Sequence, residues 1–151
     1  MKRTCAIVQI VFVVVIAGMA ALAPAGAGAQ ATSVPNLKGV WVGKADIMLP
    51  DAVTRQIHKF EFVEQEGAYL KGRHSWAIPA ENVKSYVNET ATFRATEPLL
   101  GIVGYDGTVE FVEQGDTTRF RMRLINPDAL EFTAWEGGAH PLVGRGVLLR
   151  E

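Results

Sequence analysis

The sequence predicts an all-β protein, an eight-stranded antiparallel up-and-down barrel. After Pro35, apolar and polar residues alternate repeatedly, and turn residues interrupt the alternation. Turns recurring about every 8 to 12 residues are typical of β-sandwiches and barrels. A barrel is favoured because sequential hairpins can close on themselves and leave no exposed strand edge, and a β-sandwich is the alternative.

The N-terminal segment has the pattern of a secretory signal peptide. Lys2 and Arg3 precede an apolar run, and Ala27-Gly28-Ala29 matches an A-x-A cleavage site. An uncleaved anchor is the alternative, since about 18 apolar residues nearly span a bilayer. Cys5 precedes the run, whereas a lipid-bearing cysteine would follow it. We therefore expect a signal peptide over 1–29, a flexible leader over 30–36, and a single β-barrel domain over 37–151.

The composition of the mature chain excludes several classes of function. Loss of Lys2 and Arg3 leaves 13 basic against 16 acidic residues, a net charge of −3. This balance disfavours nucleic acid, which usually requires a basic face. The mature chain has no cysteine for a disulfide, so packing alone must stabilise it after export. We expect a periplasmic or extracellular protein that meets the membrane only through its signal peptide.

The turn residues predict how the strands pair. A three-residue loop at Gln65–Gly67 would set Phe62 opposite Leu70, Phe60 opposite Gly72 and His58 opposite His74, with apolar residues on one face. The strands are expected at residues 37–48, 54–64, 68–77, 97–104, 108–114, 117–125, 129–136 and 142–150.

Three further turns predict a consistent inner face. A two-residue turn at Gly115-Asp116 sets Phe111 opposite Phe120. The turn at Tyr105–Gly107 sets Gly101 opposite Phe111, and the turn at Asn126–Asp128 sets Leu124 opposite Leu130. The inward glycines leave two interpretations open, room for a ligand or room for an opposing ring, and the pairs Phe60–Gly72 and Phe111–Gly101 favour the second. The inner face of the last strand stays ambiguous.

The stretch "EPLLGIVGYDG", followed by the turn "NPDALEF", resembles small exported bacterial proteins of unassigned function. The stretch "NLKGVWVGK" resembles the G-x-W motif on the first strand of lipocalin- and avidin-type (calycin-type) barrels, and "HPLVGRGVLLR" loosely resembles the last strand of avidin-like barrels. The resemblance implies that Trp41 closes the barrel floor and that an arginine packs on it, for which we take Arg145. It also implies a small apolar ligand. The spaced tryptophans that bind biotin in avidins are not matched.

The expected topology places the longer connections at one end, here called the long-loop end. It collects the loop 49–53, the segment 78–96, the Gly115-Asp116 turn and the loop 137–141. Such loops on a rigid barrel usually carry binding sites. We therefore predict that a small apolar or aromatic ligand binds there, with Val83, Tyr86 and Val87 on a helical turn across the mouth or simply packed as a connection. The predicted binding residues are His58, Phe60, His74, Trp76, Tyr86, Phe111, Glu113 and Phe120.

Other interpretations of these residues predict different functions. His58, His74 and His140 are candidate metal ligands, although no compact metal motif is present and no metal or other cofactor is expected. Asn88-Glu89-Thr90 is a glycosylation pattern that is common by chance. Nothing in the sequence supports an enzyme. The alternative function is an envelope protein-interaction module or a protease inhibitor that inserts the arm "QATSVPN".

Overall fold

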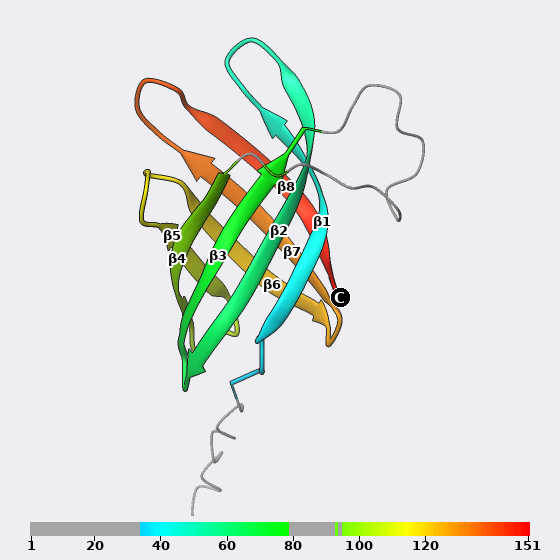
Figure 1. Cartoon of the computed structure of the whole chain (residues 1–151), viewed down its shortest axis with the longest axis vertical. Coiled ribbons are helices and arrows are strands. Elements are labelled where there is room, and N and C mark those ends of the chain that lie inside the picture. The colour runs from blue at the N-terminus through cyan, green and yellow to red at the C-terminus, as the bar shows by residue number, and fades with distance from the viewer. Residues whose placement is uncertain (1–33, 79–92, 94) are drawn as a thin grey trace, which may run out of the picture. The chain divides into compact units, whose positions relative to one another are not determined.

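The protein is an eight-stranded antiparallel barrel, which confirms the predicted fold class (Figure 1). A computed structural model describes residues 34–78, 93 and 95–151. The signal peptide, Cys5, Val83, Tyr86, Val87 and the Asn88 pattern lie outside these ranges. Within them, no helix is long and apolar enough to cross a membrane. The strands are β1 (Gly39–Met48), β2 (Val53–Glu66), β3 (Tyr69–Ala77), β4 (Ala95–Val103), β5 (Val109–Glu113), β6 (Arg119–Asn126), β7 (Ala129–Glu136) and β8 (Leu142–Arg150).

Each strand pairs with its neighbours in the chain, and β1 pairs with β8 to close the ladder. Every predicted strand boundary lies within two residues of the observed one. The turn-based registers of β4–β5, β5–β6 and β6–β7 are confirmed: Phe111 lies opposite both Gly101 and Phe120, and Leu124 lies opposite Leu130. The β6–β7 register is kept although a bulge between Leu124 and Asn126 lies beside the turn.

The predicted register of β2 and β3 is wrong. The turn consists of Gly67, with φ 56°, and Ala68, and a bulge between Phe62 and Glu64 leaves Val63 unpaired. Phe62 therefore lies opposite Gly72, not Leu70. Phe60 lies opposite His74 and His58 opposite Trp76. The bulge inserts one residue and so returns the phenylalanines to the inner face, which the regular alternation could not reveal.

The barrel interior is filled with aromatic rings. Phe62 and Phe111 stack with their ring centroids 4.8 Å apart. A methyl group at Gly101 would approach the Phe111 ring to 2.2 Å, so this glycine makes room for the ring opposite. On β8 the buried Leu148 marks the inner face, which settles the orientation of that strand. The largest fully buried rings are those of Trp41, Phe60, Phe62, Phe111, Phe120 and Phe132.

Trp41 and Arg150 close the end of the barrel opposite the long-loop end, here called the short-turn end. The guanidinium carbon of Arg150 lies 4.1 Å from the Trp41 ring centroid, so Arg145 was the wrong choice for the packing arginine. Arg150 also donates hydrogen bonds to the backbone carbonyls of Asn36, Lys38 and Pro127, at 3.0, 2.7 and 3.3 Å. Its side chain therefore joins the leader to the β6–β7 turn. Arg145 points to the outer face, because it lies on the opposite side of β8 from Leu148.

Candidate functional site

A layer of polar side chains caps the aromatic core toward the long-loop end. We define the inner polar layer as His58, His74, Glu97 and Glu113, which come from β2, β3, β4 and β5. Their positions alternate with outward residues, so all four share the inner face with the phenylalanines. His58 and His74 are each 4% exposed and Glu113 is 8% exposed. Three ionisable groups are thus held almost entirely away from water.

The buried groups form a hydrogen-bonded chain. Nδ1 of His58 lies 2.9 Å from Nε2 of His74, and Nδ1 of His74 lies 2.5 Å from Oε1 of Glu113. The histidine rings are also stacked, with their centroids 5.1 Å apart. Beneath them, the Phe60 ring stacks on His74 at 4.4 Å, and Phe132 packs against His58 at 5.3 Å. The predicted association of His58, His74 and Glu113 is therefore present, although the two histidines are diagonal neighbours rather than directly paired.

Burial sets the charge state of this chain. Burial lowers the pKa of His74 to about 3, and burial together with the neighbouring His74 lowers the pKa of His58 to about 3. Burial, followed by the charge of Asp116, raises the pKa of Glu113 to about 8. Both directions favour neutral histidines and a protonated Glu113 at pH 7. The Glu113 hydroxyl then donates to His74, and Nε2–H of His74 donates to Nδ1 of His58.

The chain ends on an atom without a partner. In the ranges that the structure describes, two buried side-chain polar atoms lack a hydrogen bond, Nε2 of His58 and Oε2 of Glu97. Buried polar groups are hydrogen-bonded in the great majority of cases, so each exception requires an explanation. With the donors in the order above, Nε2 of His58 carries a proton for which the described residues supply no acceptor.

Several carboxyl groups lie close together at the inner polar layer, toward the long-loop end. Burial raises the pKa of Glu97, and the neighbouring acidic groups of Glu113, Asp116 and Glu136 raise it as well. One ligand atom each from Glu97, Glu113 and Asp116 lies within 4.8 Å of the others. Acidic groups of this kind are common without a metal, and we assign none. The three candidate metal ligands His58, His74 and His140 are not brought together. His140 is exposed in the β7–β8 loop, away from the two buried histidines.

The remaining predicted binding residues lie at different depths. Phe60 and Phe120 lie directly beneath the inner polar layer, and the Phe120 ring is 4.8 Å from His74. Trp76 is half-buried on the inner side of β3. Phe111 stacks on Phe62 deeper in the core, so the structure does not group it with the histidines. Tyr86 lies outside the described residues.

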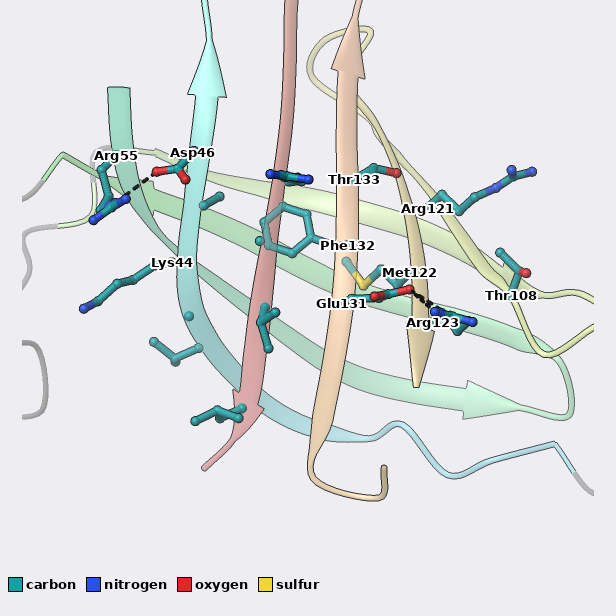
Figure 2. Close-up of a pocket in the computed structure, with 17 residues that line it drawn as sticks. Lys44, Asp46, Arg55, Thr108, Arg121, Met122, Arg123, Glu131, Phe132 and Thr133 are labelled. Carbon is teal, nitrogen blue, oxygen red and sulfur yellow. Dashed lines mark hydrogen bonds and ion pairs between the residues drawn. The ribbon is translucent and has the colours of Figure 1, made fainter. Parts of the chain in front are cut away.

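A groove on the outer face of β1, β8, β7 and β6 was not predicted from the sequence (Figure 2). The groove has a volume of about 890 Å³. Long basic side chains flank it, Lys44 and Arg55 on one side and Arg121 and Arg123 on the other. A smaller hollow of about 310 Å³ lies on the outer face of β4–β7, beside Leu100, Ile102 and Trp135. Outward charges on alternating strands normally indicate a solvated face, so the sequence carried no signal for either hollow.

The fold and the polar layer define a class, a closed eight-stranded barrel with a filled core and a buried polar end. No family model and no curated protein matches the chain. Solved structures that are similar to it include the following three, each over 76% of this chain. They are the S-type phycobiliprotein lyase CPES from Guillardia theta (TM-score 0.46, 14% identity, 88% of that chain), the protein EF1p2_mFAP2b bound to DFHBI (0.47, 11%, 94%) and a redesigned beta barrel (0.46, 13%, 91%). At these scores the likeness says nothing of a ligand for this chain.

Proposed function

We propose that the protein is an exported, non-enzymatic binding barrel that holds a small aromatic ligand at the long-loop end, against the inner polar layer. The observation that carries the proposal is Nε2 of His58, which is buried, has no partner among the described residues and ends a hydrogen-bonded chain. Export is supported by the signal-peptide pattern over residues 1–29. The protein would act in the periplasm or outside the cell.

The unpartnered atom indicates what the ligand must offer. Leaving a buried donor without an acceptor costs about 1 to 3 kcal/mol, and a ligand that supplies the acceptor recovers this energy on binding. A carbonyl or ether oxygen would suit the N–H of His58. Trp76 lies opposite His58 on β3 and is half-buried on the same inner face. A flat ring carrying one hydrogen-bond acceptor therefore fits this environment better than a simple hydrocarbon.

The filled core limits the size of the ligand. Phe60, Phe120 and Phe132 are at most 2% exposed and occupy the barrel directly below the inner polar layer. The ligand would lie above these rings, near the half-buried Trp76, rather than deep inside the barrel. The expectation of an apolar ligand is thereby sharpened to a small aromatic molecule with a polar group.

The alternative, a protein-interaction module with an inserting arm, stays a prediction. Only the end of that arm is described, and it is fixed to the barrel. Gln65 donates from Nε2 to the Pro35 carbonyl at 2.8 Å, and Arg150 donates to the Asn36 carbonyl. An arm that inserts into a partner would have to act through residues 30–33, so loss of partner binding on deleting these four residues would support it.

Binding measurements with matched aromatic probes test the proposed function. The exported protein would be titrated with acetophenone and with ethylbenzene, which has a similar shape but no acceptor, while tryptophan fluorescence is followed. We expect acetophenone to bind more tightly, by about tenfold for a hydrogen bond of about 1.4 kcal/mol. A tighter fit of ethylbenzene, or binding of neither, would contradict the proposal.

Two histidine variants serve as a matched pair for this experiment. His58→Phe keeps an aromatic ring in the buried position and removes Nε2, so it should abolish the preference for acetophenone. His140→Phe makes the same change in the exposed β7–β8 loop and should leave the preference intact. Circular dichroism would confirm that both variants fold. An unchanged preference in folded His58→Phe would rule out the proposed contact.

A further inference from the structure

The outer groove has the charge of an anion-binding surface. Its lining includes five cationic side chains and two carboxylates, in a chain whose formal net charge is −1. The cationic residues are Lys44, Arg55, Arg121, Arg123 and Arg145, and the carboxylates are Asp46 and Glu131. The groove is therefore a local basic region on an acidic protein, and this contrast concentrates anions there.

Most of the arginines at the groove already have acidic partners. Arg55 pairs with Asp46 at 2.9 Å and Arg123 with Glu131 at 2.7 Å, as Figure 2 shows. Arg121 pairs with Glu110, a neighbour on β5, at 2.8 Å. These exposed pairs contribute little to stability. They do hold the flanking side chains in position around the groove.

Arg145 differs from the other arginines. It is exposed at the middle of the groove, where it lies opposite Asp46 on β1 and opposite Thr133 on β7. Among the described residues it makes no ion pair or side-chain hydrogen bond. An arginine guanidinium offers a planar fork of donors that matches a carboxylate or phosphate. The fork of Arg145 is therefore available to an anion from outside.

Apolar side chains continue the groove along β8 from Arg145. The outward residues that follow are Val147 and Leu149, which are 47% and 60% exposed. Val42 on β1 lies opposite Leu149 and also lines the groove. At about 3.3 Å per residue, Leu149 lies about 13 Å from Arg145 along the strand. The groove thus has a cationic part and an apolar part, side by side on one strand.

We propose that this outer groove binds a small organic anion with an apolar body, with its anionic group on Arg145 and its body along Val147, Leu149 and Val42. The volume of about 890 Å³ falls within the range of small-molecule sites. Every strand of the barrel is paired on both sides, so a peptide cannot bind here by adding a strand. The side chains that would hold the ligand point to the opposite face of the barrel wall from the inner polar layer, as the outward positions of Arg145, Val147 and Leu149 on β8 show.

Titrations with eight-carbon probes, all below their micelle concentrations, test the proposal. Octanoate and octyl phosphate carry two different anionic groups on the same chain, and octanol and octylammonium lack the negative charge. Backbone amide shifts in two-dimensional NMR locate the binding. We expect an anionic probe to shift amides on β1, β7 and β8 around Arg145 and to bind at least tenfold more tightly than octanol. The stronger of the two anions identifies the preferred group.

A matched pair of arginine variants makes the test specific. Arg145→Gln should weaken binding of the anionic probe about tenfold or more. Arg73→Gln removes the same charge from an exposed position on β3, outside the groove, and should leave binding unchanged. The proposal is overturned if neither anion binds, if octanol binds as well as they do, if the shifts map elsewhere, or if the two variants behave alike.

Discussion

Replacing Glu113 by glutamine should change how stability depends on pH. Burial raises the pKa of Glu113 from 4.5 to about 8 in the folded protein. Between these values the folded state holds a proton that the unfolded state has released, so stability is lost as the pH rises toward 8. The two histidines have the opposite effect, because their pKa values are lowered from 6.5 to about 3. Stability should therefore peak near pH 6.5.

The size of the alkaline loss follows from these values. One proton over the interval from pH 6.5 to 8 corresponds to about 2 kcal/mol of unfolding free energy. Glutamine cannot ionise, and its amide can still donate to Nδ1 of His74. We therefore expect Glu113→Gln to remove this loss, so that its stability relative to the wild type rises by about 2 kcal/mol between pH 6.5 and 8.

Urea unfolding followed by tryptophan fluorescence, at half-unit steps from pH 5.5 to 8.5, would measure this effect. Trp41 is fully buried and reports on the core. Glu110→Gln is the control, because Glu110 lies on the same strand but faces outward and is exposed. A wild type whose stability is flat from pH 6.5 to 8, or a Glu113→Gln variant with the same alkaline loss, would refute the assigned charge state.

Two further predictions concern the core and the short-turn end. Gly101→Ala should cost about 1 to 3 kcal/mol of unfolding free energy, because the added methyl group overlaps the Phe111 ring. Gly137→Ala has open space and no positive φ, so it should cost nothing in the same urea series. Arg150→Lys should lose about 2 kcal/mol and shift the Trp41 emission, because lysine cannot form the three carbonyl hydrogen bonds from a planar fork. An unshifted emission with wild-type stability would contradict the role given to Arg150.

The fold was predictable because most of its strands are regular. The alternation around Phe111 and Phe120 sets one face, and short turns convert that face into a register. The β2–β3 prediction failed at two points, the turn, which is Gly67-Ala68, and the bulge at Val63, which leaves no mark in an alternating pattern. Arg145 and Arg150 both lie on the last strand, and only the pairing of β8 with β1 shows which of them reaches Trp41.

The candidate site was predictable only in part. Topology alone brought His58, His74 and Glu113 to the inner face at one end, since all three alternate with outward residues. Glu97 was missed because its strand was expected to begin there, which left its direction undefined. The outer groove depends on the three-dimensional curvature of four strands and on the ion pairs that position its arginines. Neither property can be derived from residue spacing.

The most direct test of the binding proposal is the histidine ring spectrum during a ligand titration. In ¹⁵N-labelled protein at pH 7, long-range proton–nitrogen NMR distinguishes the two ring nitrogens of each histidine. We predict that His58 is neutral with its proton on Nε2, and that adding acetophenone shifts this nitrogen saturably while the ring of His140 stays unchanged. A His58 ring that is charged, or one that is unmoved while the probe binds, would contradict the account.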